Sequence, residues 1–142
     1  MKMIFFACLL LPFFFACKKN DSGGSGATCS LSVAAVAGTY KLTSMRYKPN
    51  GGTESEVIGA LNTCQLDDLL IFNANGTYIY QDAGISCSPN GTYPGDWTLN
   101  GNTLTMEAIS STVQSFSCTT FTYYTLNIPN TGDKYIFKYT RQ

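Results

Sequence analysis

The chain has 142 residues, with nine basic and nine acidic side chains and no histidine. Its length allows one domain, and the balanced charge argues against nucleic-acid binding because no excess of positive charge exists to displace counterions. The lack of histidine excludes Ser-His-Asp and Cys-His catalytic groups and histidine metal sites. Because the sequence also offers no metal-ligand cluster and no phosphate-binding loop, we expect neither an enzyme nor a cofactor.

The first 16 residues have the composition of a signal peptide. Lys2 precedes an apolar stretch that is shorter than the about 20 residues of a membrane-spanning helix, and the stretch ends at the small residue Ala16. Cys17 follows at once. A cysteine in this position resembles the bacterial lipobox. The resemblance implies that the signal peptide is cleaved off before Cys17, which becomes the first mature residue and carries acyl chains such as palmitate. The alternative is a plain signal peptide cleaved nearby, with Cys17 incidental.

The residues after Cys17 indicate a tether. Residues 17–28 are rich in Gly and Ser, which is typical of a flexible linker. A lipid anchor followed by a linker would hold a folded domain, residues 29–142, at a membrane. We therefore expect an outer-membrane lipoprotein of a bacterial cell envelope, and the periplasmic and cell-surface sides both remain open.

Four of the six cysteines lie in the predicted domain: Cys29, Cys64, Cys87 and Cys118. In an exported chain, an even number of cysteines predicts two disulfides. We favour Cys64–Cys87 because a predicted hairpin between them brings their ends together, which leaves Cys29 to pair with Cys118. The alternative is a four-cysteine metal site, which the scattered spacing without any CxxC pair disfavours.

From residue 38 the chain is rich in Thr and Tyr, and turn residues recur at short intervals, so it is predicted to be all-β. Asn-Gly pairs at residues 75–76 and 100–101 are typical of tight hairpins. The predicted strands cover residues 38–48, 68–73, 77–82, 92–99, 102–107, 112–117, 120–128 and 133–141. Eight antiparallel strands in up-and-down order can close into a barrel that leaves no free edge.

Alternating residues indicate which face of a strand is buried. Tyr135, Phe137 and Tyr139 share one face of the last strand, and Met106 lies opposite Glu107 in the fifth. This alternation predicts that the aromatic and apolar side chains face the barrel interior and that Glu107 faces water.

Two segments do not fit a regular meander. Residues 30–37 are apolar and predict a turn of helix that caps one end of the barrel. Residues 49–63 form a long connection in which Val57, Ile58 and Leu61 share one face of a predicted short helix. Such a connection either acts as a lid or simply covers the barrel end, and we favour the second interpretation.

The order of several short motifs resembles a known family. Gly38-Thr39-Tyr40 resembles the Gly-x-Trp motif that opens the first lipocalin strand. The further motifs are Cys64-Gln65-Leu66-Asp67-Asp68, Phe72, Asn75-Gly76-Thr77-Tyr78, Cys87, Gly95-Asp96-Trp97-Thr98-Leu99 and Leu104-Thr105-Met106. Together they are similar to the lipocalin-like domain lipoproteins of Bacteroidetes over roughly residues 38–140. The resemblance implies a lipocalin-like barrel and supports the Cys64–Cys87 pairing, and it brings no catalytic residues.

These observations leave two functional hypotheses. In the first, the barrel binds a small hydrophobic ligand, with Tyr40, Trp97 and Phe137 as candidate contacts. In the second, the barrel is filled by side chains and the protein contacts another envelope protein or glycan. We interpret Trp97 mainly as a core residue and Asp67-Asp68 as polar residues at the start of a strand rather than a cation site. We expect a monomer without bound metal.

Overall fold

The computed structural model describes residues 29–142. The predicted signal peptide, the lipidated Cys17 and the tether lie outside the described residues. Within residues 29–142, no helix has the length and apolar character needed to cross a membrane.

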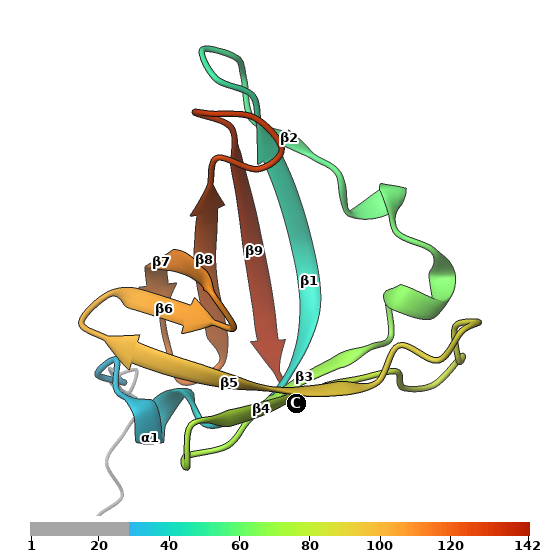
Figure 1. Ribbon diagram of the computed structural model, residues 1–142, viewed down its shortest axis with the longest axis vertical. Coiled ribbons are helices and arrows are strands. Elements are labelled where there is room, and N and C mark those ends of the chain that lie inside the picture. The colour runs from blue at the N-terminus through green and yellow to red at the C-terminus, as the bar shows by residue number, and fades with distance from the viewer. Residues whose placement is uncertain (1–28) are drawn as a thin grey trace, which may run out of the picture.

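The described chain folds almost entirely into antiparallel β-sheet, as predicted. The strands are β1 (Gly38–Lys48), β2 (Ser55–Glu56), β3 (Leu69–Phe72), β4 (Thr77–Gln81), β5 (Tyr93–Asn100), β6 (Thr103–Met106), β7 (Ile109–Phe116), β8 (Thr120–Leu126) and β9 (Lys134–Arg141). From β3 to β9 each strand pairs with its neighbours in chain order, β1 pairs with β3, and β9 pairs back with β1 (Figure 1). The eight strands other than β2 therefore close into an up-and-down barrel.

Short helical turns fill two of the connections. The helix α1 (Val33–Val36) begins where Ser32 accepts a hydrogen bond from the backbone N–H of Ala35, and it confirms the predicted turn of helix. The long connection after β1 differs from the single helix that we predicted. It forms the two-residue strand β2 and two 3₁₀ turns, η1 (Ile58–Ala60) and η2 (Thr63–Gln65), because backbone pairing of residues 55–57 with β1 replaces helical hydrogen bonds.

A cluster of aromatic side chains fills one end of the barrel. Tyr40, Phe72, Trp97 and Phe121 are each at most 2% exposed. The rings of Phe72 and Trp97 lie 4.7 Å apart between centroids, and those of Tyr40 and Phe121 lie 5.9 Å apart. Such ring pairs stabilise a core beyond the area they bury, by about 0.5–1.5 kcal/mol each. We call this end, with α1 and the turns 73–76, 101–102 and 117–119, the closed end.

The opposite end of the barrel carries the longer loops. Figure 1 shows the β1–β2 and β8–β9 loops at the end of the barrel opposite α1 and the C-terminus. We call this end, with the connections 49–54, 82–92, 107–108 and 127–133, the mouth.

Two disulfides join segments that are distant in sequence. Cys29 pairs with Cys118 across a sequence separation of 89, and Cys64 pairs with Cys87 across a separation of 23. Both pairings match the prediction. The first fixes the start of the domain to the β7–β8 turn at the closed end, and the second fixes η2 to the β4–β5 connection at the mouth. In the chain-entropy description, loops of these lengths stabilise the fold by about 3 to 5 kcal/mol each.

Candidate functional site

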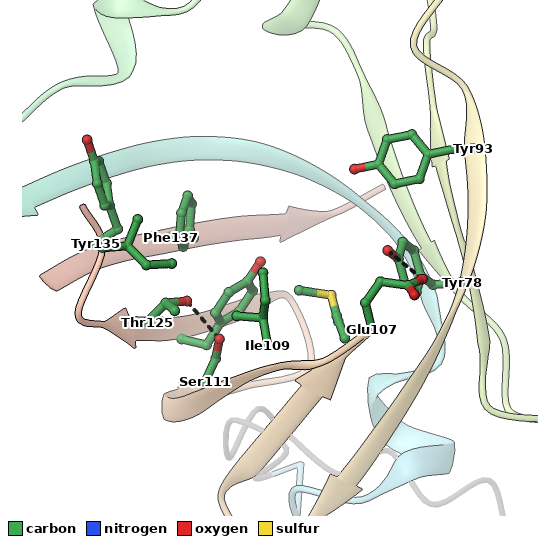
Figure 2. Close-up of a pocket in the computed structure, with 11 residues that line it drawn as sticks. Tyr78, Tyr93, Glu107, Ile109, Ser111, Thr125, Tyr135 and Phe137 are labelled. Carbon is green, nitrogen blue, oxygen red and sulfur yellow. Dashed lines mark hydrogen bonds between the residues drawn. The ribbon is translucent and has the colours of Figure 1, made fainter. Parts of the chain in front are cut away.

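A cavity of about 320 Å³ opens at the mouth of the barrel. Its walls come from β4 to β9 and the loops that join them (Figure 2). The residues that line it are Tyr78, Tyr93, Met106, Glu107, Ile109, Ser111, Tyr123, Thr125, Ile128, Tyr135 and Phe137. Tyr78 and Tyr123 are buried, whereas Tyr93, Ile109 and Ile128 are exposed. The cavity therefore has a buried floor and an apolar rim that meets solvent.

Aromatic rings form the wall on the side of β8 and β9. The centroids of Tyr123 and Phe137 lie 5.4 Å apart, and those of Phe137 and Tyr135 lie 6.1 Å apart. Residues 135, 137 and 139 point inward, as their alternation in the sequence predicted, because neighbouring side chains of a strand face opposite sides. The wall thus presents ring faces and edges to any molecule in the cavity.

A buried pair of hydroxyl groups interrupts the apolar surface. The Ser111 and Thr125 side chains hydrogen-bond to each other across 2.7 Å. Because each satisfies the other, the pair adds little net polarity to the wall. The sequence analysis did not find Ser111, since it began the strand at residue 112. Its inward position follows from the alternation once β7 is known to begin at Ile109.

Glu107 meets solvent, as predicted, and also lines the cavity. Its carboxylate accepts a hydrogen bond from the Tyr78 hydroxyl across 3.5 Å (Figure 2). The sequence analysis did not find its place in the cavity wall, because Glu107 belongs to the β6–β7 turn and has a φ of 53°, so the alternation of an extended strand does not apply to it.

Gly95 makes room for this arrangement. It pairs with Tyr78 in the β4–β5 ladder, and a Cβ atom added to it would lie 2.5 Å from the Tyr78 ring and would clash with the Glu107 carboxylate. Only glycine lets the ring and the carboxylate approach the backbone so closely.

The phenol groups of Tyr78, Tyr93 and Tyr123 stay protonated at neutral pH. Burial raises the pKa of Tyr78 to about 12, and the nearby Tyr93 and Glu107 add to this increase. Burial also raises the pKa of Tyr123 and Tyr93. These hydroxyl groups are therefore neutral hydrogen-bond donors in the conditions under which the protein would meet a ligand.

The comparisons with known proteins agree with this architecture. A family model described as a lipocalin-like domain matches residues 36–128, which span β1 to β8 and most of the cavity lining. The chain belongs to the lipocalin-like domain family. No curated protein and no solved structure matches the chain.

Within this lipocalin-like barrel, the three predicted ligand contacts lie in two different places. Tyr40 and Trp97 belong to the core at the closed end, where the Tyr40 hydroxyl donates to the Val36 carbonyl across 2.8 Å and Trp97 Nε1 donates to the Asn73 carbonyl across 3.0 Å. Phe137 lines the cavity. No residue of the connection 49–63 lines it, so this connection does not form a lid over the cavity in the structure.

One buried carboxylate joins two loops of the mouth. Asp133 is 3% exposed and accepts hydrogen bonds from the Tyr47 hydroxyl across 2.7 Å and from the backbone N–H of Asn50 across 2.8 Å. It also accepts from Asn130 in its own loop. These bonds hold the pKa of Asp133 below its usual value. The β1–β2 and β8–β9 loops are therefore held together beside the cavity.

The Asp67-Asp68 pair, which lies just before β3, has a similar structural role because it holds the β4–β5 connection. Asp68 accepts from the Tyr80 hydroxyl across 2.8 Å, and Asp67 accepts from the backbone N–H of Ile85 across 2.8 Å. Asp82 accepts from the backbone N–H groups of Cys87 and Gly91. Among the described residues, no group of three His, Cys, Asp or Glu side chains is arranged to hold a metal ion.

Proposed function

We propose that this protein is a lipid-anchored envelope protein whose lipocalin-like barrel holds a small hydrophobic ligand in the mouth cavity. The cavity carries the proposal. Its volume of about 320 Å³ falls at the lower end of the range of about 300–1,000 Å³ that is typical of small-molecule sites. Its walls are mainly aromatic and aliphatic, with few polar groups, which is the composition that such sites share.

A probe whose fluorescence rises in apolar surroundings tests the binding. We would titrate N-phenyl-1-naphthylamine into the chain that begins at residue 18, which contains the whole barrel, its core and both disulfides. Met106 points into the cavity, so Met106→Trp should fill it and weaken binding at least about tenfold. Thr103→Trp places the same side chain on the outer face of the same strand and should leave binding unchanged.

Equal binding by both variants, or no binding at all, would overturn the ligand proposal. It would favour the second hypothesis, in which the protein contacts another envelope component. One observation supports that alternative: three isoleucines at the mouth, Ile85, Ile109 and Ile128, are exposed by 59%, 53% and 38%. Exposed apolar side chains that gather on one end of a molecule are typical of a contact surface.

The proposed lipid anchor is supported by the sequence around Cys17 and by an extracytoplasmic location. Two disulfides indicate an extracytoplasmic protein, and the segment before Cys17 has the pattern of a lipoprotein signal peptide. Expression of the full chain in bacteria fed labelled palmitate should label the protein in the outer-membrane fraction. The Cys17→Ser variant should remain unlabelled, and labelling that persists in this variant would contradict the anchor.

A further inference from the structure

The residues that line the cavity include an acidic side chain but no basic one. Glu107 is the one carboxylate among the residues that line the cavity. No Lys or Arg lines the cavity. A ligand with an anionic head would therefore meet a carboxylate and find no cation to pair with it.

The Glu107 carboxylate is exposed to solvent and has no strong hydrogen-bond partner among the described residues. Its hydrogen bond from Tyr78 is 3.5 Å long, which is at the limit for such a bond. In the part of the chain that the structure describes, the one ion pair joins Arg46 to Glu54, so Glu107 has no cationic partner there. The carboxylate can thus accept further, stronger hydrogen bonds from a molecule in the cavity.

The rings around Glu107 suit a cationic group. Tyr78 and Tyr93 lie 6.4 Å apart between centroids in an edge-to-face arrangement, and Figure 2 shows both beside Glu107 on the β5 side of the cavity. The faces of aromatic rings carry partial negative charge and attract ammonium groups within about 6 Å. The opposite wall, with Phe137 and Tyr123, offers apolar surface instead.

We propose that the ligand of this cavity is a cationic amphiphile, which is an amine whose ammonium group binds Glu107 and whose apolar body lies against Tyr123 and Phe137. The inference rests on the proposed ligand-binding function and narrows it to one chemical class. The backbone of Glu107 is consistent with selection for this side chain, because a φ of 53° favours glycine or asparagine. A glutamate at such a position indicates that the carboxylate itself has a role.

Three ligands of equal chain length separate the head group from the apolar body. We would measure how decylamine, decanol and decanoate displace N-phenyl-1-naphthylamine from the chain that begins at residue 18. Decylamine should displace the probe at a concentration about tenfold below that of decanol, since hydrogen bonds to charged groups are the strong ones. Decanoate should be the weakest of the three.

Two variants of Glu107 and one control variant test whether the Glu107 carboxylate causes the preference for decylamine. Glu107→Gln removes the charge and keeps the shape, so decylamine and decanol should then bind equally well. Glu107→Asp keeps the charge and should retain part of the preference for the amine. Glu54→Gln removes a carboxylate from the β1–β2 loop that does not line the cavity, and it should change nothing. Thermal unfolding of each variant shows that the domain remains folded.

The outcomes separate this inference from the proposed function. If the probe binds and Met106→Trp blocks it, but the three ligands compete equally or decanoate competes best, the cationic class is wrong and the hydrophobic binding function stands. A preference for decylamine that survives in Glu107→Gln would also overturn the role of Glu107. If neither the probe nor any of the three ligands binds, both proposals are wrong.

Discussion

At the scale of single residues, Glu107 combines an unfavourable backbone conformation with a place in the cavity wall. Its φ of 53° lies in the left-handed region, which costs a residue with a Cβ atom about 1–2 kcal/mol relative to glycine. We therefore expect Glu107→Gly to raise the free energy of unfolding by about 1 kcal/mol, as measured by urea denaturation. The same variant should lose the preference for amines.

A neighbouring substitution controls for the flexibility that glycine adds to the unfolded chain. Ala108 lies next in the same turn but is not among the residues with positive φ. Ala108→Gly should therefore lower the free energy of unfolding by about 0.5–1 kcal/mol. If Glu107→Gly destabilised the protein as much as Ala108→Gly does, the left-handed conformation would not be a source of strain.

Arg141 connects the last strand to the helix that caps the closed end. Its guanidinium donates to the carbonyls of Ala35 and Ala37 and to the Tyr40 hydroxyl, the last across 2.7 Å. A planar group with several fixed donors can serve three acceptors at once, whereas an ammonium on a flexible stem cannot do so with the same geometry. We expect Arg141→Lys to lower the free energy of unfolding by about 1–3 kcal/mol, measured by urea denaturation.

A matched substitution tests whether the loss of stability comes from these hydrogen bonds or from any exchange between Arg and Lys on this strand. Lys138 lies on the same strand and is exposed. Lys138→Arg is the reverse exchange, from Lys to Arg, at a position that does not contact α1. It should alter stability by less than about 0.5 kcal/mol. An equally small effect of Arg141→Lys would show that the contacts with α1 add little to stability.

At the scale of elements, local turn chemistry decides how much the sequence reveals. The turns at 75–76 and 100–101 contain Asn-Gly, an easily recognised pair in which the glycine takes the positive φ, and the strands on both sides of each were predicted almost to the residue. The β6–β7 turn uses Glu107 and Ala108 instead. Neither Glu107 nor Ala108 is a typical turn residue, so the start of β7 was missed. Ile109 and Ser111 were therefore also missed as cavity residues.

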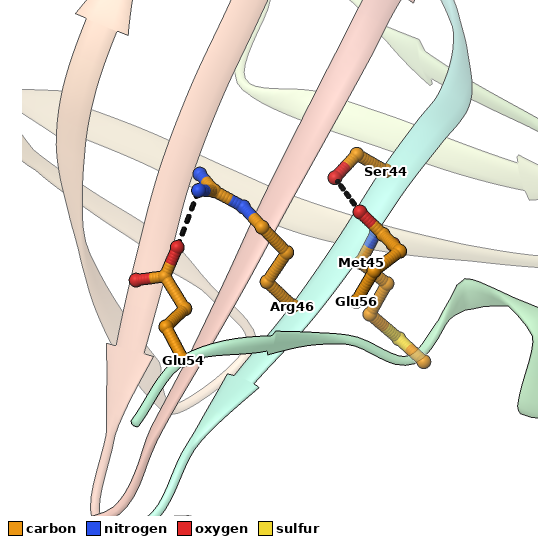
Figure 3. A network of polar contacts seen from close by, with 5 residues as sticks. All are labelled: Ser44, Met45, Arg46, Glu54 and Glu56. Carbon is orange, nitrogen blue, oxygen red and sulfur yellow. Dashed lines mark hydrogen bonds and ion pairs between the residues drawn. The ribbon is translucent and has the colours of Figure 1, made fainter. Parts of the chain in front are cut away.

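The strand β2 was also missed. It pairs with β1 at only two positions, and the side chain of Glu56 provides further hydrogen bonds to β1. β3 pairs with β1 up to Lys41, and β2 pairs only with Arg46 and Tyr47. Between these pairings, the Glu56 carboxylate accepts from the backbone N–H of Met45 across 2.8 Å and from the Ser44 hydroxyl across 2.6 Å (Figure 3). Glu56 thus covers a stretch of β1 that would otherwise be an unpaired edge.

This arrangement predicts a pH-dependent attachment of β2. The hydrogen bonds from Ser44 and Met45 lower the pKa of Glu56 below 4.5. A carboxyl whose pKa is lowered in the folded state stabilises the attachment above its unfolded pKa, and this stabilisation is lost as the pH falls through the folded value. The Met45 amide resonance should therefore shift with a midpoint below pH 4.5 in an NMR titration.

Replacement of the carboxyl group provides the control. In Glu56→Gln the Met45 amide should have a different shift at neutral pH and should not titrate in this range, because the side chain no longer ionises. A Met45 shift that titrates identically in this variant would mean that another acidic group, such as Glu54 on the same loop, controls the edge.

At the scale of the whole molecule, the class of fold follows from strand count and hairpin order, but the position of the cavity does not. Alternation assigns Tyr40, Trp97 and Phe137 alike to the barrel interior, and it says nothing about which end of the barrel each side chain occupies. Tyr40 and Trp97 pack under α1 at the closed end, and Phe137 lies at the mouth. That distinction arises from the shear of the closed barrel and from where the capping helix sits, which are properties of the assembled sheet.

The closed barrel also determines at which end the chain enters the domain. Cys29 is bound to Cys118 in the β7–β8 turn, so the described domain begins at the closed end. The mouth loops, with Ile128 and Asp133, lie at the opposite end (Figure 1). If Cys17 is lipidated as proposed, the chain enters the domain at its closed end, and we expect the mouth to face away from the membrane on average.

Paramagnetic broadening measures this orientation. In lipidated protein reconstituted into nanodiscs that contain a gadolinium-chelating lipid, amide signals of the closed-end turns, such as Asn75 and Thr119, should lose more intensity than those of Ala108 and Thr131 at the mouth. The chain that begins at residue 18, mixed with the same nanodiscs, controls for contacts that do not depend on the lipid. Stronger broadening at Ala108 and Thr131 would show instead that the exposed isoleucines of the mouth hold it against the bilayer, where an apolar ligand would enter directly from the lipid.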